Sequence, residues 1–292
     1  MGKTAVRVLA GLVGLLVLLV AYGVLIEPRL RLEEVHLDAR LDHLDDAWAG
    51  ERVVVFSDLQ VGMWFANLGM IERVVARASE EDPAAVLIPG DFIYGKDPDV
   101  EVQIEQVLDL LDPLFAAEIP VYTVLGNHDH SSGGAEELTD ALEARGAHVL
   151  RNESVTIAHP DRPDAPGLRL VGVGPTRPGL ADLDGALAGI ERDEPRLVMM
   201  HNPTTFPDLP ANSAPLTVAG HTHCGQISLP GTPHWSYLDL TEEEKLVADG
   251  YAADDYGQDG NRMYVTCGIG FSLMPMRVNA PPQLVVIELA PA

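Results

Sequence analysis

The sequence has few basic residues. Lysine occurs only as Lys3, Lys96 and Lys245, and the formal net charge of the 292-residue chain is -25. An acidic surface repels polyanions, and no cluster of Lys and Arg forms a track for a nucleic-acid backbone. We therefore expect no nucleic-acid partner and rank a nuclease low. Salt tolerance or simple solubility explains the acidity equally well, so the net charge by itself does not identify a binding partner.

Cysteine is also scarce. Cys224 and Cys267 are the only two, which excludes a disulfide framework. They could pair in an oxidising compartment, or they could be two small apolar side chains of the core. Their spacing does not choose between these alternatives. No long low-complexity tract is present, and 47% hydrophobic and 22% charged residues are typical of a globular chain with one large domain or two small ones.

Charged residues are missing between Val8 and Ile26, where nearly every side chain belongs to Val, Leu, Ala or Gly. A helix of that length spans roughly 29 Å, close to the hydrocarbon thickness of a bilayer. A buried helix of this kind would need protein on all its sides. A cleavable signal peptide has a shorter apolar stretch of about 7–15 residues and a small-x-small cleavage site, which residues 19–23 match poorly. We predict an uncleaved transmembrane signal anchor over residues 1–26.

Charge does not decide the orientation of this anchor, because Lys3 and Arg7 precede it while Arg29 and Arg31 follow it. A large acidic domain after a lone N-terminal anchor favours export. We therefore expect a single-pass membrane protein whose domain is extracytoplasmic. Residues 27–48 are polar with scattered Leu and Val, and we expect a tether that leads into a first edge strand. A folded domain is predicted over residues 49–292.

Strands and helices alternate in the first half of this domain. Continuous apolar runs predict buried strands at residues 52–56, 84–88 and 121–125, and helix-spaced apolar positions predict helices at 67–79 and 100–115. This alternation favours parallel βαβ units. Further along, short strands are expected near residues 154–158, 169–173, 196–200, 216–219, 263–266 and 284–289. The sum is an α/β sandwich of mixed sheets with helices outside, and the acidic stretch 241–260 is expected to be a surface excursion or lid.

Polar side chains stand where the predicted strands end. Ligands of an open α/β sheet bind outside the carboxyl ends of its strands, so these segments can deliver their side chains to one crevice. A single polar residue after a strand is more often a turn residue or a helix cap. Five such segments, each directly after a predicted strand, are not expected by chance. The segments are Asp58-Leu59-Gln60, Gly90-Asp91, Gly126-Asn127-His128-Asp129, His201-Asn202-Pro203 and Gly220-His221-Thr222-His223.

These five motifs resemble the signature of the calcineurin-like metallophosphoesterases, and most closely that of the small bacterial membrane-associated phosphodiesterases. The likeness covers roughly residues 53–289 in the same order. It implies a four-layer αββα sandwich of mixed β-sheets with outer helices, here preceded by one N-terminal transmembrane helix. The C-terminal tail is similar too, at Gly268-Ile269-Gly270, Met274-Pro275-Met276-Arg277 and Pro281-Pro282.

The resemblance implies two adjoining metal sites that share Asp91. The family usually has His at the position of Gln60. The side-chain oxygen of Gln is a neutral ligand, and it is harder than the ring nitrogen of His. The first site is therefore either functional or weakened, and we expect a functional one because every other ligand is present. The implied ligands are Asp58, Gln60, Asp91 and His223 for the first site, and Asp91, Asn127, His201 and His221 for the second.

Two divalent ions are the expected cofactors. The oxygen-rich first set suits Mn²⁺, Fe or Mg²⁺, and the second set suits Mn²⁺, Fe or Zn²⁺, so manganese is preferred. A water shared by two ions roughly 3.5–4 Å apart is a strong nucleophile for in-line attack on phosphorus. As in the family, His128 would donate a proton to the leaving oxygen. Asp129 would either fix the tautomer of the His128 ring or cap a helix.

The function expected from this reading is a two-metal-dependent phosphoester hydrolase, a phosphodiesterase or phosphatase. Its substrate would be a small phosphoester, a phospholipid or a nucleotide-linked molecule at the membrane, reached through the N-terminal helix. The alternative is a catalytically silent, membrane-displayed metal-binding or scaffold module, for which Gln60 is the only support. A protein phosphatase ranks low, because nothing indicates a long peptide groove. Of the remaining histidines, His130 and His234 could contact substrate, while solvated positions are expected for His36, His43, His148 and His159.

Overall fold

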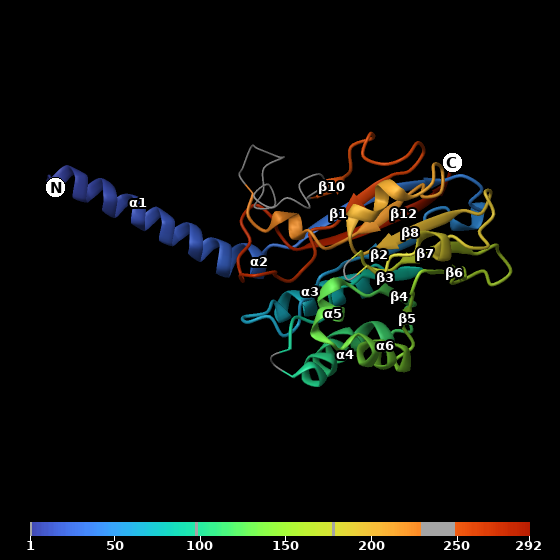
Figure 1. The fold of residues 1–292 in the computed structure, drawn as a ribbon, viewed down its shortest axis with the longest axis horizontal. Coiled ribbons are helices and arrows are strands. Elements are labelled where there is room, and N and C mark those ends of the chain that lie inside the picture. The colour runs from blue at the N-terminus through green and yellow to red at the C-terminus, as the bar shows by residue number, and fades with distance from the viewer. Residues whose placement is uncertain (1, 97–98, 177–178, 229–248) are drawn as a thin grey trace.

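The computed structural model describes residues 2–96, 99–176, 179–228 and 249–292. Two six-stranded mixed β-sheets pack face to face, with helices on the outer faces (Figure 1). Apolar side chains fill three layers: between the first sheet and its helices, between the two sheets, and outside the second sheet. The predicted four-layer αββα sandwich is thus confirmed, although the layer over the second sheet is thin, with α7 (Leu183–Ala186) and the 3₁₀ segment η3 (Pro203–Asp208).

The first sheet contains the strands that lead to the first three motifs. Every side chain of β3 is buried, as expected for a parallel strand that is covered on both faces. It pairs in parallel with β2 on one side and β4 on the other. The strand order is β1 (Glu33–Leu41), β12 (Gln283–Pro291), β2 (Arg52–Val55), β3 (Ala85–Pro89), β4 (Val121–Val124) and β5 (His148–Val149).

The second sheet carries the remaining two motifs. Its central strands β7, β8, β9 and β11 run in parallel, and the outer strands β6 and β10 are antiparallel to their neighbours. All strands expected from the sequence are present, within the one or two residues by which such boundaries ordinarily vary. The order is β10 (Gly250–Tyr251), β11 (Met263–Val265), β9 (Thr217–Ala219), β8 (Arg196–Met200), β7 (Leu168–Val173) and β6 (Glu153–Ile157).

Helices α3 (Leu68–Glu80), α4 (Val100–Ala116) and α6 (Ala135–Ala144) cover the first sheet, and α5 (Asn127–Ser132) follows β4. The apolar face of α3 repeats at helical spacing, with Met70, Ile71, Val74 and Val75 buried. Asp99 caps the N-terminus of α4, because its carboxylate accepts a hydrogen bond from the backbone N–H of Glu101. Both long helices expected in this half of the chain are therefore confirmed.

The N-terminal segment forms one continuous helix that extends away from the sandwich (Figure 1). It consists of α1 (Lys3–Ala21), a π-helical turn η1 (Tyr22–Ile26) and α2 (Glu27–Leu30). No residue of α1 is buried. Among the described residues, this is the one helix whose length and composition suit a membrane span.

Residues 27–48, expected to be a tether, belong instead to the folded domain. Strand β1 pairs in parallel with β12 along its whole length, from Glu33 to Leu41. The 3₁₀ segment η2 (Asp46–Trp48) follows, and the side chain of Trp48 is fully buried between the sheets. Alternate apolar residues such as Leu37 and Ala39 face the core, so this mostly polar segment forms a strand with one buried face. Part of the acidic stretch expected as a lid, residues 241–248, lies outside the described residues, and β10 lies in the rest.

Candidate metal centre

The carboxyl ends of five strands, three in the first sheet and two in the second, carry the predicted ligands. Asp58 and Gln60 follow β2, Asp91 follows β3, and Asn127 begins α5 directly after β4. From the second sheet, His201 follows β8, and the pair of histidines in the last motif follows β9. The structure brings these segments together where the two sheets meet.

The side chains predicted for the second ion lie closest together. The Nε2 atom of His201 is 3.1 Å from Oδ1 of Asn127, 3.1 Å from Nδ1 of His221 and 3.3 Å from Oδ2 of Asp91. Ligand atoms of Asp91, His201 and His221 all lie within 4.8 Å of one another, which suits a metal ion. On its other side, Nδ1 of His201 is 2.7 Å from the carbonyl oxygen of Pro89. A proton on Nδ1 therefore leaves the Nε2 lone pair facing the other ligands.

The side chains predicted for the first ion are arranged more loosely. Nε2 of His223 lies 3.6 Å from Oδ1 of Asp58, and Nε2 of Gln60 donates to Oδ2 of Asp91 over 2.8 Å. Among the described residues, the buried Oε1 atom of Gln60 has no hydrogen-bond partner. A buried oxygen without a partner loses hydration and gains nothing in return. A hard cation would satisfy it, so these residues fit a metal ion.

Several predicted ligands have left-handed backbone conformations. The φ angle is 56° at Asp58, 53° at Gln60 and 59° at Asp91, and it is 74° at His221 and 50° at His223. Such angles are uncommon for residues other than glycine, and each costs on the order of 1–3 kcal/mol. Strain of this kind is typical of sites where the surrounding structure holds side chains in a working geometry.

Two motif glycines allow backbone to approach the carboxylates. A Cβ atom at Gly126 would lie 2.1 Å from Oδ1 of Asp91, and one at Gly268 would lie 2.6 Å from Oδ2 of Asp58. Any side chain at either position would push a predicted ligand out of place. The glycines of the third motif and of the C-terminal tail are therefore part of the geometry of the centre.

The charges at the centre are mutually dependent. Burial raises the pKa of Asp58 to about 6, while His201 acts to lower it. Burial would also raise the pKa of Asp91, but the charge and hydrogen bond of His201 outweigh burial and hold that pKa below its ordinary value. Burial likewise works against the protonated form of His201, yet Asp91 raises its pKa to about 10. The protonation of Asp58, Asp91 and His201 is therefore coupled through their mutual charges.

His128 lies beside the predicted ligands and is half-buried. Its backbone N–H donates to Oδ1 of Asp91 over 2.9 Å, which ties its position to the centre. Its ring stacks on Tyr94, with 4.7 Å between the ring centroids. Burial lowers the pKa of His128. Tyr94 was missed by sequence reasoning, because a single tyrosine three residues after the second motif carries no signal of its own.

Asp129 has the capping role rather than the role of orienting the His128 ring. Its carboxylate lies in the backbone turn that begins α5, and its hydrogen bonds hold this turn to the loop after β3. Burial, reinforced by the charge of Asp91, raises the pKa of Asp129 to about 7. The carboxylate accepts hydrogen bonds from the backbone N–H groups of Asp91 (3.0 Å), Phe92 (2.8 Å), Ile93 (3.0 Å) and Gly126 (2.8 Å).

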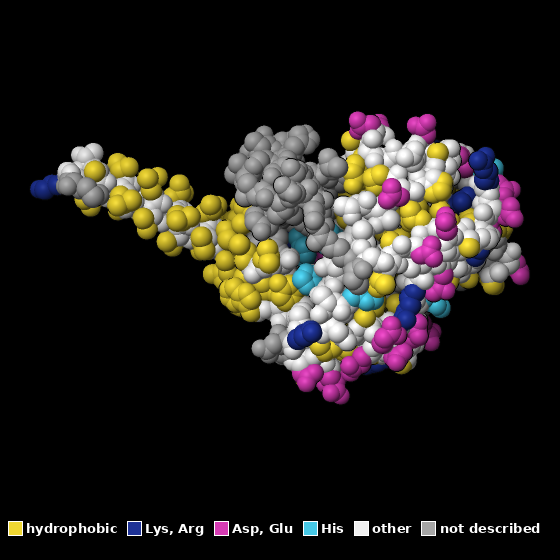
Figure 2. All heavy atoms as spheres, viewed as in Figure 1, with side chains coloured by type: hydrophobic (Ala, Val, Ile, Leu, Met, Phe, Trp, Pro, Cys, Tyr) yellow, Lys and Arg dark blue, Asp and Glu magenta, His cyan; other side chains and the backbone are white. Residues whose placement is uncertain are grey.

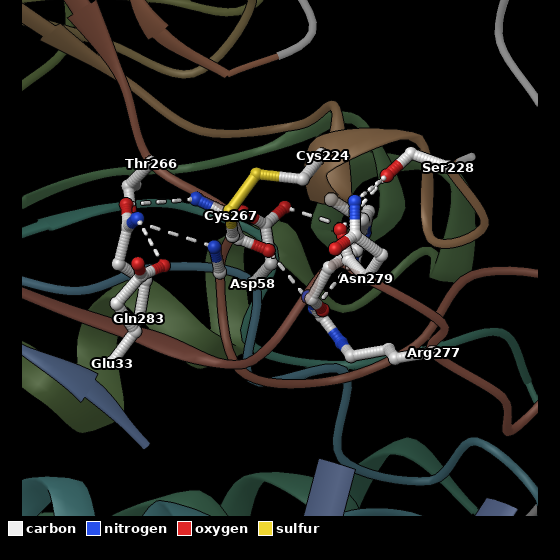
Figure 3. Close-up of a disulfide and its surroundings, with 12 residues drawn as sticks. Glu33, Asp58, Cys224, Ser228, Thr266, Cys267, Arg277, Asn279 and Gln283 are labelled. Carbon is white, nitrogen blue, oxygen red and sulfur yellow. Dashed lines mark hydrogen bonds and ion pairs between the residues drawn. A yellow bond between two sulfur atoms is a disulfide. The ribbon is translucent and has the colours of Figure 1, made fainter. Parts of the chain in front are cut away.

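A disulfide joins Cys224 to Cys267, which decides the alternative that the sequence left open (Figure 3). The two Cα atoms are 4.7 Å apart. Cys224 directly follows His223, and the residue after Cys267 is Gly268, which packs against Asp58. The disulfide therefore connects the backbone of one first-set ligand to the loop that packs against another.

Arg277 was quoted in the C-terminal tail, but its place in the centre could not be foreseen. It is fully buried, and its Nη2 atom lies 3.3 Å from Nδ1 of His223. The guanidinium also donates to the carbonyl oxygens of Cys267 (2.9 Å) and Gly270 (2.7 Å) and, through Nη1, of Ala280 (3.1 Å). Burial lowers the pKa of Arg277 to about 10, so it remains cationic at neutral pH. Figure 3 shows this side chain below the disulfide, on the same side as Asp58.

The other histidines divide into several cases. His36, His43 and His148 are exposed, as expected, but the expectation that His159 is solvated was wrong. His159 is buried against Trp48, with Nε2 2.9 Å from the carbonyl oxygen of Ala47, and its Nδ1 accepts two backbone N–H groups. His130 lines a cavity of about 230 Å³ with Leu125, Leu150 and Arg151, where a substrate contact stays a prediction. His234 lies outside the described residues.

Several known proteins are similar in sequence to this chain over most of its length. The family model for calcineurin-like phosphoesterases matches residues 51–225. Phosphodiesterase YaeI of Escherichia coli is 30% identical over 254 residues, which cover 86% of each chain. Metallophosphoesterase YkuE of Bacillus subtilis is 26% identical over 273 residues, covering 92% of this chain and 88% of YkuE. A transmembrane protein with a metallophosphoesterase domain from Danio rerio is 24% identical over 274 residues, covering 88% of this chain and 57% of that protein.

The matched region begins just before β2 and ends just after His223, so it contains all five motifs. The chain therefore belongs to the calcineurin-like phosphoesterase family and is a metal-dependent phosphoester hydrolase.

Proposed function

We propose that this protein hydrolyses phosphodiester bonds, and phosphomonoesters less readily, at a membrane surface. The observation that carries the proposal is the convergence of the seven predicted ligand side chains at the meeting edge of the two sheets. The partnerless Oε1 of Gln60 and the close packing of Asp91, His201 and His221 support a centre for two cations. The choice of diesters rests on the phosphodiesterase relative.

The proposed ligand sets are those expected from the sequence, with Asp91 shared by both. Two divalent ions held there would supply a nucleophilic water at neutral pH and neutralise charge on the phosphoryl oxygens. The two carboxylates of Asp58 and Asp91 offset only part of the charge of two such ions. The centre would therefore stay net positive and attract a phosphate group. Manganese remains the preferred metal because both donor sets suit it.

The neighbouring side chains would orient the substrate and move the proton. His128 lies at the edge of the centre, and its backbone bond to Asp91 and its stacking on Tyr94 fix where its ring can reach. A ring held there can donate a proton or hydrogen bond to the leaving oxygen. Asp129 would contribute indirectly, because it holds the turn that presents both His128 and Asn127.

The location at a membrane rests on separate observations. The helix from Lys3 to Leu30 is long and apolar enough to span a bilayer, and a zebrafish relative is named as a transmembrane protein. The disulfide between Cys224 and Cys267 supports a domain on the oxidising, extracytoplasmic side, where such bonds persist.

The proposal is tested with the full-length chain in detergent, stripped of metal and assayed on methyl p-nitrophenyl phosphate with Mn²⁺ restored. We expect turnover that is lost in Asp91→Ala and strongly reduced in His128→Ala. Asp112→Ala, which removes an exposed carboxylate paired with Arg145, serves as the control and should keep its activity. Stoichiometric binding of two ions without turnover by any divalent metal would instead support the scaffold alternative.

A further inference from the structure

The N-terminal helix is attached rigidly to the domain. The backbone N–H of Arg277 donates to the carbonyl oxygen of Gly23 over 2.8 Å. Gly23 packs so closely that a Cβ atom there would lie 2.7 Å from Val278. Four residues later, the buried carboxylate of Glu27 accepts the backbone N–H of Ala280 over 2.7 Å. The end of the helix therefore has a fixed position relative to the loop that follows β11.

Arg29 fixes the helix to a second loop, the one between Gln60 and α3. Its guanidinium donates to the carbonyl oxygens of Phe65 (2.6 Å) and Ala66 (2.7 Å). The same group stacks over the ring of Phe65 at 4.2 Å and lies 5.2 Å from the ring of Phe271. The loop after Gln60 and the loop after β11 are thus held side by side at the end of the helix.

Large apolar side chains are exposed on both loops. Trp64 is 66% exposed and Phe65 is 52% exposed, while Leu273 and Met274 on the other loop are 61% and 40% exposed. Figure 2 shows hydrophobic side chains gathered where the helix joins the domain, with histidines visible beside them. Elsewhere among the described residues after Leu30, such exposure is confined to three scattered positions, Val102, Leu180 and Tyr251. Isolated exposed side chains are ordinary, but a contiguous group indicates a partner.

The position of this group along the helix identifies the partner as a bilayer. The uncharged segment ends at Ile26, so a membrane that takes up roughly 29 Å of helix has its boundary there. Arg29 lies one turn further on and holds Phe65 at that level. Tryptophan prefers the interface between lipid and water, and arginine at this depth pairs with lipid phosphates.

The same two loops carry parts of the metal centre. Asn67 connects them, because its Nδ2 donates to the carbonyl oxygens of Pro28 (2.9 Å) and Ile269 (3.0 Å). Next to Ile269, the backbone N–H of Gly270 donates to the carbonyl oxygen of Asp58 over 2.7 Å. The loops that carry the apolar group are therefore bonded to the segment that carries Asp58.

We propose that Trp64, Phe65, Leu273 and Met274 insert into the lipid interface and place the mouth of the metal centre at the membrane surface. Its substrate is then a lipid phosphoester whose acyl chains stay in the bilayer while the phosphate enters the centre. This substrate class rests on the proposed phosphoester hydrolysis, but the insertion itself does not.

Insertion is tested by quenching in proteoliposomes of full-length protein that contain lipids brominated along the acyl chain. The difference between wild type and Trp64→Phe isolates the emission of Trp64, because the other two tryptophans, Trp48 and Trp235, are common to both. We expect this difference to be quenched most strongly by bromine near the carboxyl end of the acyl chain. If no brominated lipid quenches the emission of Trp64, the proposed insertion is wrong, whether or not the protein hydrolyses any ester.

The substrate class is tested in the same vesicles with two esters that share one leaving group. One is the p-nitrophenyl ester of dioleoyl phosphatidic acid, and the other is water-soluble methyl p-nitrophenyl phosphate. For Trp64→Ser/Leu273→Ser we expect kcat/KM on the lipid ester to fall about tenfold, equivalent to roughly 1.4 kcal/mol. Its activity on the soluble ester should not change, and the matched control Val102→Ser/Leu180→Ser should match wild type on both.

Equal loss on both esters, or no loss on the lipid ester, overturns the assignment of a lipid substrate. If wild type cleaves neither ester while Trp64 is quenched as expected, the proposed hydrolysis fails and the membrane insertion stands.

Discussion

The two sets of predicted ligands differ in what holds them in place. In the second set, His201 contacts both Asn127 and His221 directly, and a single backbone carbonyl orients its ring. In the first set, His223 depends on Arg277 behind its ring and on the disulfide that begins at the next residue. The second set thus keeps its geometry through its own contacts, while the first depends on loops that come from the C-terminal part of the chain. Changes to those loops should therefore affect one metal site and spare the other.

The largest effect is expected where the two sets meet. Asp91→Asn removes the shared negative charge, so both sites should lose affinity together. We expect kcat/KM on methyl p-nitrophenyl phosphate to fall on the order of a thousandfold. Elemental analysis should find less than one ion per chain, whereas Asp112→Asn should bind metal like wild type. Full occupancy of one site in Asp91→Asn would mean that the two sets do not share this residue.

Arg277→Lys should affect the first site alone. Lysine cannot reproduce the several hydrogen bonds of the guanidinium, so His223 would lose its support. We expect the affinity of the first site to fall about 10–100-fold, with the second unchanged, in calorimetric Mn²⁺ titrations. Arg196→Lys is a matched control, because Arg196 is also buried and bound to backbone carbonyls, away from the centre. Equal weakening of both sites would remove the distinction between them.

Loss of the disulfide should have a smaller effect on metal binding. In Cys224→Ser/Cys267→Ser we expect the Mn²⁺ concentration for half-maximal activity to rise about tenfold, because the backbone after His223 gains freedom. The closed loop, with a sequence separation of 43, predicts a loss of about 4 kcal/mol in the free energy of unfolding. Wild type treated with dithiothreitol should behave in the same way and recover on reoxidation. An unchanged Mn²⁺ requirement together with lowered stability would give the disulfide a purely structural role.

The smallest change is expected from Gln60→His. An imidazole at this position restores the usual family ligand. Activity with Mn²⁺ should therefore change by about threefold at most, and Zn²⁺ should bind the first site more tightly. Competition between the two metals, followed by elemental analysis, measures this shift. A complete loss of activity in Gln60→His would show that the amide is required for more than coordination.

The sequence was sufficient to predict much of the fold and the residues that gather at the centre. Buried strands such as Ala85–Pro89 are continuous apolar runs, and Asp91 stands where that run ends, so local pattern and topology together place it. Asp129 is different, because a carboxylate after His128 can orient a ring or accept backbone N–H groups. Asp129 accepts backbone N–H groups because the loop after β3, 36–38 residues away in sequence, lies against its carboxylate.

What the sequence determined by itself is the class of side chain at each strand end and the apolar span at the N-terminus, because both depend on neighbours along the chain. Tertiary structure alone decided that Cys224 reaches Cys267, that Arg277 supports His223 and that residues 33–41 join the first sheet. These outcomes depend on distances between segments far apart in sequence, which no local pattern encodes. The burial of His159 follows the same rule, since the carbonyl oxygen of Ala47 that its ring contacts is 112 residues away in sequence.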